Sequence, residues 1–260
     1  MIEIINLCKS FDGKKVLDNL NLEIKTGETI VIIGRSGCGK SVLLKLIIGL
    51  LKPDSGEIII DGEDITRLKG KELDRIRMKF GMLFQSSALF DSLTVRENVG
   101  FFLYEHGYTE KDKIEERIRE CLRLVGLAGT EDLYPVQLSG GMKKRVALAR
   151  AICMHPEIIL YDEPTTGLDP ITADAINNLI VSLHDKLKIT AIAVTHDMKS
   201  AFRIGDRIAM LYKGRIIAVG TPEEIKNTEN PLVRQFILGE AKGMIEIEEE
   251  GGISIEKENV

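Results

Sequence analysis

The stretch TIVIIGRSGCGKSVLLKLIIGL, residues 29 to 50, joins two apolar runs through a glycine-rich loop. TIVIIG consists mainly of β-branched residues, which is typical of a strand covered on both faces, and the apolar positions of KSVLLKLIIGL follow helical spacing. Between them, GRSGCGKS (34 to 41) fits the pattern G-x-x-x-x-G-K-[ST], which binds phosphates when it follows a strand and opens a helix. The stretch therefore predicts an α/β fold with a nucleotide at this turn. The alternative is a tight turn that merely exposes a lysine.

Each part of this loop has a distinct chemical task. Its glycines let backbone amides curl around phosphate oxygens, and the helix N-terminus adds partial positive charge. Lys40 would reach the outer phosphates, and the Ser41 hydroxyl would bind Mg²⁺. The side chains of Arg35 and Cys38 fill variable positions and receive no role. As candidate nucleotide-binding residues, the loop contributes Gly34, Ser36, Gly37, Cys38, Gly39, Lys40, Ser41 and Val42.

The composition narrows the classes of function. With 260 residues, 44% of them apolar, the chain can bury a substantial core, and a net charge of -5 argues against a protein that coats nucleic acid. The four cysteines lie far apart without a CxxC pair, which favours reduced thiols over a zinc site or a disulfide framework. The N-terminus lacks the layout of a signal peptide, and no apolar run is long enough to span a bilayer. We therefore expect any membrane role to depend on a partner.

Apolar patterns along the chain predict its organisation. Residues 2 to 26 alternate as in half-buried antiparallel strands, and further strands are expected at EIIIDG, FGMLFQ, EIILYDEP and ITAIAVTH. Residues 94 to 155 and the segment ITADAINNLIVSLHDKL have helical spacing. Because strands and helices alternate, we expect a mostly parallel sheet. DRIAMLYKGRIIAVG predicts a hairpin, and TPEE predicts a helix start with a capping box.

These patterns divide the chain into a single domain and a tail. Residues 1–240 form the domain, in which 1–87 and 157–240 make a nucleotide-binding core with an antiparallel β edge, and 88–156 make an inserted helical subdomain. Residues 241–260 form an acidic tail. The tail is interpreted either as disordered or as an ordered hairpin that packs on a neighbour.

Two adjacent carboxylates end the apolar strand IILYD. Asp162 and Glu163 would lie near the phosphate loop, because the carboxyl ends of parallel strands meet at one edge of the sheet. Asp162 is suited to hold Mg²⁺, and Glu163 is suited to polarise a water that attacks the γ-phosphate. Without the phosphate loop, such a pair is more often solvated surface charge.

Gln85 and His196 also end apolar strands, so the same edge of the sheet would hold both. Each is weak evidence alone, since a polar residue at a strand end is usually an ordinary loop contact. Beside the other motifs, Gln85 could sense the metal or the water. His196 could donate a hydrogen bond to the γ-phosphate.

The segment LSGGM, residues 138 to 142, opens a second helix that is suited to bind an anion. Ser139, Gly140 and Gly141 would present a hydroxyl and free backbone amides at its N-terminus. The alternative is a capped helix with glycines in its first turn. The motif raises the question of why one chain would carry two phosphate sites at helix starts.

The chain contains, in this order, GRSGCGKS, Gln85, LSGGM, ILYDEP, GLDP and VTH. In order and approximate spacing, these motifs resemble those of the ATP-binding subunits of ABC transporters, and the resemblance covers residues 1–240. The resemblance implies an ATPase that binds ATP and Mg²⁺ and works as a head-to-tail pair, in which the LSGG loop of one copy caps the γ-phosphate held by the other. It implies that Ser139 and Gly141 serve the ATP of a second copy of the chain, and that Asp169 contacts that copy. The family's adenine-stacking aromatic corresponds to Phe11, which is otherwise an edge-strand core residue.

The signature of that family usually ends in glutamine, whereas Met142 stands here and cannot hydrogen-bond a ribose hydroxyl in the same way. With GMLFQSSALFDSLTVRENVGFFL around Gln85, this substitution resembles the Mce/Mla-type branch, whose ATPases drive phospholipid or other lipid traffic across the cell envelope. The resemblance implies transmembrane permease subunits docked in a groove near residues 85–100, accessory lipid-binding subunits, and a place on the cytoplasmic face of the inner membrane. Phe90, Leu93 and Val95 are candidates to line the groove, and the alternative is that they are core residues.

Other functions stay open at this point. One is the import or export of another small solute, and another is a soluble ABC-type ATPase that works on DNA, ribosomes or iron–sulfur assembly. Such DNA and ribosome proteins usually carry a long coiled-coil insertion or two ATPase units, and this sequence has neither. A P-loop kinase or GTPase would need a substrate site or an NKxD-like stretch, and we find none. A further hypothesis is that Met244 to Val260 clasps the second copy.

Overall fold

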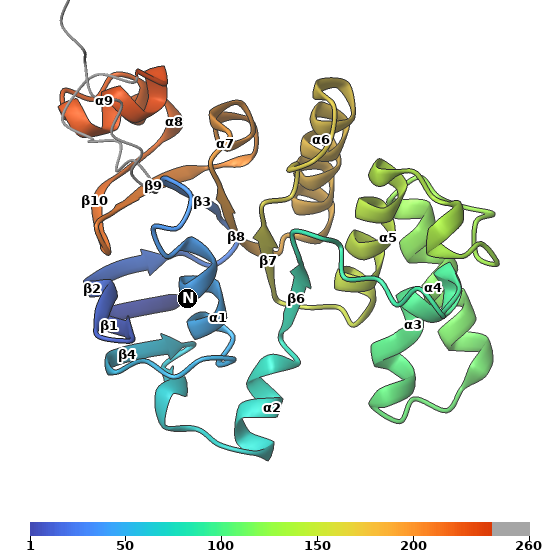
Figure 1. The fold of residues 1–260 in the computed structure, drawn as a ribbon. Helices are drawn as coiled ribbons and strands as arrows, with labels where there is room; N and C mark the ends of the chain where they lie inside the picture. Colours follow the sequence, from blue (N-terminus) through green and yellow to red (C-terminus); the bar gives the residue numbers. More distant parts are fainter. Residues whose placement is uncertain (241–260) are drawn as a thin grey trace, which may run out of the picture.

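The computed structural model describes residues 1–240, so the expectations for the tail lie outside the described residues. At its centre is a six-stranded sheet with the order β10-β9-β3-β8-β7-β6 (Figure 1). All neighbours pair in parallel except β9 and β10, which form the predicted hairpin. The expectation of a mostly parallel sheet is confirmed. Its strands are β3 (Thr29–Ile33), β6 (Phe80–Leu83), β7 (Ile158–Asp162), β8 (Thr190–Thr195), β9 (Arg207–Tyr212) and β10 (Arg215–Gly220).

Both faces of this sheet are buried. Along β3, Ile30 and Ile32 belong to one hydrophobic core together with side chains of α1 (Lys40–Ile47). Val31 and Ile33 belong to the other core, together with side chains of α6 (Pro170–Leu187). Successive side chains of a strand point to opposite faces, so a strand that is apolar at every position suits only such a doubly covered place.

A second, antiparallel sheet has the order β2-β1-β4-β5. Buried positions alternate at Ile2 and Ile4 of β1 and from Leu20 to Ile24 of β2, and these apolar side chains share the core that contains α1. The stretch EIIIDG forms β4 of this sheet and not a strand of the central one. Its strands are β1 (Ile2–Phe11), β2 (Lys14–Ile24), β4 (Ser55–Ile60) and β5 (Glu63–Asp64).

Three helices form the inserted helical region, α3 (Val95–Glu105), α4 (Lys111–Leu124) and α5 (Gly140–Cys153). Thr94 caps α3 in a capping box with Glu97, and Thr221 does the same with Glu224 in α8 (Pro222–Lys226), as predicted for TPEE. The sequence did not predict three short helices and two 3-10 turns of the described chain. These are α2 (Lys71–Arg77), α7 (Met198–Ile204), α9 (Pro231–Leu238), η1 (Ile65–Arg67) and η2 (Pro135–Gln137). Segments this short contain too few turns for a helical period to be recognised.

Helix α5 packs closely on β6. A Cβ atom at Gly81 would lie 2.3 Å from the carbonyl oxygen of Ala151, and a backbone atom cannot easily yield. We expect Gly81→Ala to destabilise the fold by about 1–3 kcal/mol, as overpacking of a core does. Urea unfolding measures the change, and Gly140→Ala is the control, because its Cβ would make an ordinary 3.5 Å contact with Leu168. Equal stability of the two variants would contradict the close approach.

Candidate functional site

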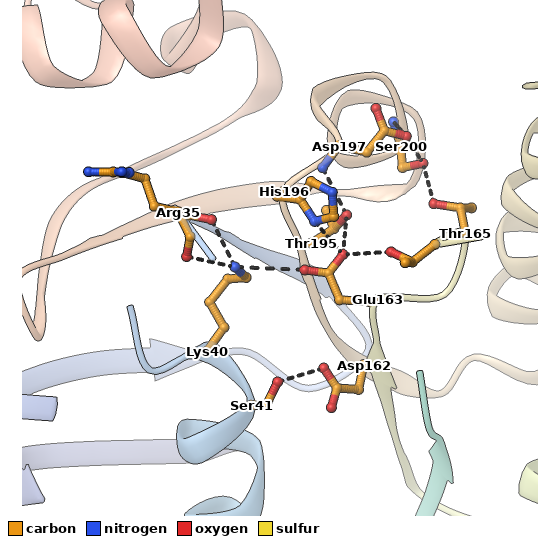
Figure 2. A network of polar contacts seen from close by, with 12 residues as sticks. Arg35, Lys40, Ser41, Asp162, Glu163, Thr165, Thr195, His196, Asp197 and Ser200 are labelled. Atoms are coloured by element: carbon orange, nitrogen blue, oxygen red, sulfur yellow. Dashed lines mark hydrogen bonds and ion pairs between the residues drawn. The ribbon is translucent and has the colours of Figure 1, made fainter. Parts of the chain in front are cut away.

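Five of the predicted site residues meet at one edge of the central sheet, where its parallel strands end: Lys40, Ser41, Asp162, Glu163 and His196 (Figure 2). β3 leads into the glycine-rich loop, β7 ends at Asp162, and β8 is followed by His196. On β6, Leu83 pairs with Tyr161 of β7, so the chain reaches Gln85 at the same edge. β6 ends at Leu83, whereas the sequence predicted a strand that ends at Gln85.

The glycine-rich loop adopts backbone conformations that favour glycine. Gly37 and Gly39 have φ angles of 76° and 106°, where a side chain would be strained. At Gly34, a Cβ atom would lie 2.5 Å from the carbonyl oxygen of Leu211 in β9. The loop ends at the start of α1, where the first amides lack partners within the helix. This helix start can therefore bind an anion.

Lys40 is the first residue of α1, and its side chain reaches back into the loop and is only 6% exposed. Its Nζ donates to the carbonyl oxygens of Gly34 at 2.8 Å and Arg35 at 3.1 Å. The same ammonium lies 3.7 Å from Glu163 Oε1. A buried cation that spans the loop is well placed to meet the negative charge of phosphates.

Ser41 and Asp162 meet between α1 and β7. The Ser41 hydroxyl donates to Asp162 Oδ1 at 2.9 Å. Burial raises the pKa of Asp162 above its ordinary value, and repulsion from Glu163 adds to this effect. The bond from Ser41 acts in the opposite direction and lowers the pKa. A hydroxyl and a carboxylate are oxygen ligands of the kind that Mg²⁺ prefers, and a bound cation would favour the ionised carboxylate.

Glu163 is held by donors on one side. Its Oε2 accepts from the hydroxyls of Thr166 and Thr195, both at 3.2 Å, and lies 3.0 Å from His196 Nδ1. Its φ of 48° is unusual for a residue with a side chain, and such strain is concentrated at functional sites. Because the residue is only 8% exposed, its carboxylate has a restricted orientation.

His196 is the exposed member of this group, with 56% of its side chain accessible. In a neutral ring, the contact with Glu163 places the proton on Nδ1 and leaves Nε2 as an acceptor. Donation from His196 to a phosphate therefore requires the doubly protonated ring or a change of partner.

The second helix start lies apart from these residues. In Figure 1, β6 lies between α5 and α1. The Ser139 hydroxyl caps α5 by accepting from the Met142 amide at 3.3 Å, and Asp169 caps α6. A Cβ atom at Gly141 would lie 2.6 Å from Thr172 Cγ2, so α5 and α6 begin side by side. Within residues 1–240, no described polar contact joins Ser139 or Gly141 to the phosphate loop.

Phe11 is the last residue of β1 and is 41% exposed, so it is not a core residue. The Lys9 ammonium lies 5.3 Å from the centre of its ring. An exposed ring of this kind can stack on a flat base.

A family model described as ABC transporter matches residues 17–166. The chain belongs to the ABC transporter family. The probable ribonucleotide transport ATP-binding protein mkl of Mycobacterium leprae is 42% identical over 249 residues, which cover 96% of this chain and 72% of that protein. The intermembrane phospholipid transport system ATP-binding protein MlaF of Haemophilus influenzae is 42% identical over 245 residues, which cover 94% of this chain and 93% of that protein.

A solved structure supports the same conclusion. The dimeric, post-hydrolysis state of the ATP-binding cassette MJ0796 bound to ADP and Pi aligns with a TM-score of 0.78 and 37% identity, over 85% of this chain and 99% of that chain. The predicted fold, a P-loop core with an antiparallel β edge and an inserted helical region, is confirmed. This ABC protein is an ATPase, and within residues 1–240 it has no helix long and apolar enough to cross a bilayer.

Two cations of this ABC ATPase received no role in the sequence analysis. Lys144 and Arg150, on α5, are 4% and 5% exposed. Lys144 Nζ donates to the Gln85 carbonyl oxygen, and Arg150 donates to the carbonyl oxygens of Ser87 and Ala88 at 2.7 Å each. Burial lowers the pKa of Lys144, which the nearby carboxylates of the site oppose. These contacts hold the loop of Gln85 against α5, and the only signal in the sequence was their place among apolar positions of the helix.

The three residues predicted to line a permease groove differ in how far their side chains are buried. Val95 is fully buried in the core of the helical region, so the core interpretation holds for it. Leu93 is half-buried, and Phe90 is 43% exposed, with its ring 4.6 Å from that of Phe101. Beyond residues 85–100, a hollow of about 580 Å³ opens where α3, α4 and α5 end or begin. Its lining includes Leu103, Tyr108, Ile114, Arg117 and His155.

Proposed function

We propose that two copies of this ABC ATPase enclose two MgATP head to tail, and that hydrolysis drives a membrane permease. The observation that carries the proposal is the separation of two anion-binding helix starts in one chain. The start of α1 is joined to Asp162 and Glu163 by direct contacts, whereas the start of α5 is not. A second copy, turned head to tail, would let each α5 start complete the other copy's site. The dimeric state of the MJ0796 cassette supports this arrangement.

Each residue of the site has a task in this proposal. Lys40 leaves its backbone carbonyls to bind the outer phosphates, while the loop amides from Gly34 to Val42 surround them. Glu163 orients and polarises the attacking water with the carboxylate that the two threonines hold in place. His196 donates a hydrogen bond to the γ-phosphate. Gln85 completes the group at the metal and water.

Mg²⁺ would be held by Ser41, Asp162 and Gln85 together with phosphate oxygens. All three residues offer oxygen atoms, and Mg²⁺ is usually bound by few protein ligands besides phosphates and waters. When bound, the ion neutralises charge on the β- and γ-phosphates. The bond between Ser41 and Asp162 keeps both ligands in one place before the ion binds.

Residues on the other copy would finish the nucleotide site. Ser139, Gly140 and Gly141 contribute a hydroxyl and amides at the γ-phosphate, and Asp169 contacts the facing copy beside them. Both Ser139 and Asp169 cap helices in their own chain and are exposed, so these helix starts are accessible to a facing copy. Phe11 stacks on the adenine.

The permease would dock on the helical subdomain, residues 88–156. Aromatic side chains follow one another along it, with ring centres 4.6 Å apart for Phe90 and Phe101 and 5.4 Å apart for Phe101 and Phe102. Phe90 and Phe102 are 43% and 44% exposed. Exposed aromatic side chains that follow one another in this way favour binding of an amphipathic helix. We call Phe90, Phe101 and Phe102 the aromatic row.

We expect Phe102→Glu to lower the amount of permease that co-purifies with the ATPase by about tenfold or more, because aromatic anchors dominate binding energy. Nucleotide hydrolysis by the isolated protein should stay within about twofold, since the aromatic row does not touch the site. Met78→Glu is the matched control, because Met78 is 46% exposed and caps the C-terminus of α2. Equal recovery of the permease with both variants would contradict docking on the aromatic row.

The proposed cargo is phospholipid or another lipid of the cell envelope, with accessory lipid-binding subunits and a place on the cytoplasmic face of the inner membrane. The similarity to MlaF, which spans nearly the whole of both proteins, supports this cargo. The equal identity to mkl, whose name refers to ribonucleotide transport, is the reason to keep another small solute as the second candidate.

One experiment tests partner and cargo together. The protein is purified from detergent-solubilised native membranes, and the co-purifying subunits and lipids are identified by mass spectrometry. Multispanning subunits with bound phospholipid are the expected result. Recovery of the ATPase with a multispanning subunit but no lipid enrichment would favour another solute. Recovery without any membrane subunit would favour an ATPase that takes no part in transport.

A further inference from the structure

A group of buried polar side chains lies between α6 and α7, next to the loops that carry Glu163 and His196. Thr165, Asn177 and Ser200 are 7%, 2% and 0% exposed. Thr165 follows Glu163 by two residues, Ser200 lies in the first turn of α7, and Asn177 lies within α6. None of them was singled out in the sequence, because their meeting depends on how the two helices pack.

The Ser200 hydroxyl is the centre of this group (Figure 2). It donates to Asp197 Oδ2 at 2.5 Å, accepts from Asn177 Nδ2 at 2.9 Å, and lies 3.2 Å from the Thr165 hydroxyl. A serine hydroxyl has one proton and two lone pairs. Because the Ser200 O–H donates its hydrogen bond to Asp197, the Thr165 hydroxyl must be the donor in its contact with Ser200. The bonding capacity of this hydroxyl is then fully used.

Two paths lead from Ser200 to the catalytic carboxylate. Along the first, Asp197 donates its amide to the Thr195 hydroxyl at 3.0 Å, and Thr195 donates to Glu163 Oε2 at 3.2 Å. His196 is the residue between Thr195 and Asp197, so this path also sets its position. Along the second, Thr165 fixes the backbone that follows Glu163. Ser200 thus joins the loops after β7 and β8.

Asn177 connects this centre to the body of α6, whose first turn carries Asp169 as its cap. The amide is expensive to bury, because Oδ1 has no hydrogen-bond partner among the described residues. Its neighbours along the helix, Ile176 and Ile180, belong to the hydrophobic core. An apolar side chain would suit this position better for stability alone.

We propose that Asn177 and Ser200 are positioning residues for ATP hydrolysis, which hold the loops of Glu163 and His196 in register with α6. The proposal rests on the roles proposed above for Glu163 and His196. Through these hydrogen bonds, α6 is connected to the site. A contact of a partner with Asp169, the N-cap of α6, would therefore act on the water-polarising carboxylate through Ser200.

Ser200→Ala tests the proposal in steady-state hydrolysis by the full chain. We expect kcat to fall by about tenfold to a hundredfold, the range that a small misplacement of a catalytic group can cause. KM for MgATP should stay within about twofold, because the phosphate loop keeps its own contacts. An unchanged kcat would overturn the proposal.

Two further variants separate positioning from loss of stability. Thr190→Val removes another buried hydroxyl, which accepts from the Gly27 amide at 2.9 Å at the opposite end of β8, so it should lower Tm without lowering kcat. Asn177→Leu combined with Ser200→Ala removes both partners of one bond, so part of the lost stability should return. kcat should remain low in this double variant. Recovery of kcat together with Tm would overturn the proposal.

Glu163→Gln in the same assay distinguishes the two levels of inference. If it abolishes turnover while Ser200→Ala keeps the wild-type kcat, the positioning role fails and the proposed site stands. If Glu163→Gln hydrolyses ATP normally, the assignment of the catalytic carboxylate fails, and the positioning role fails with it.

Discussion

Glu163→Gln is expected to lower kcat by about a hundredfold to ten-thousandfold, the range that a general base contributes, while the affinity for MgATP is retained. The glutamine side-chain amide is nearly the same size as the carboxylate, so it fills the same space between Lys40, Thr195 and His196. What is lost is the negative charge that polarises the water. Phosphate binding is left intact, because it depends on the loop amides and on Lys40.

The measurement needs both turnover and binding. Phosphate release gives kcat, equilibrium titration with a fluorescent nucleotide gives affinity, and light scattering in MgATP reports whether the bound protein accumulates as a dimer. Glu157→Gln is the matched control, because Glu157 adjoins the other end of β7 and its side chain is 61% exposed. Turnover at the wild-type rate by Glu163→Gln would refute the assignment of the catalytic carboxylate.

Two inactive variants are expected to restore activity to each other when mixed. Lys40→Ala removes the cation of the phosphate loop, and Ser139→Arg places a large charged side chain at the start of α5, so each homodimer should be inactive. In a mixed dimer, one site contains both defects, while the other combines an intact loop with an intact α5 start. With random pairing, about a quarter of the sites are intact, so turnover should approach about a quarter of the wild-type rate if sites act independently.

Concentration dependence provides the control for this experiment. Each variant alone, at the same total concentration, should remain inactive, and the activity of the mixture should rise with the concentration of the second variant. Wild-type turnover should likewise fall upon dilution, as dimers dissociate. If dilute monomeric protein turned over ATP at full rate, or if Ser139→Arg left hydrolysis unchanged, a site shared between two copies would be excluded.

The identity of this protein could be derived largely from contiguous stretches of sequence. A phosphate loop uses neighbouring backbone amides and a helix start, so GRSGCGKS contains nearly all the information for its own function. Strand ends at Asp162 and His196 could be placed together, because parallel strands must bring their carboxyl ends to one edge. The antiparallel edge was predicted from alternating apolar and polar residues, and buried positions alternate from Leu20 to Ile24 of β2.

The sequence left alternatives open, or gave no indication of a role, where packing between distant segments decides. Val95 carries the same apolar side chain whether it lines a groove or fills a core, and only the arrangement of α3, α4 and α5 buries it completely. Lys144 and Arg150 look like ordinary surface charges in a helix, yet α5 lies so close to β6 that both reach the loop of Gln85.

The sequence by itself determined the proposed chemistry of this protein, since the residues proposed for phosphate binding and water polarisation lie in short motifs whose members are neighbours in the chain. Tertiary structure alone decided which residues hold the site residues in position and where the start of α5 lies relative to the start of α1. Asn177 and Ser200 are separated by 23 positions and meet only because α6 and α7 pack together. The close packing of α5 on β6 fixes where α5 begins, and within residues 1–240 no described polar contact joins Ser139 to Lys40.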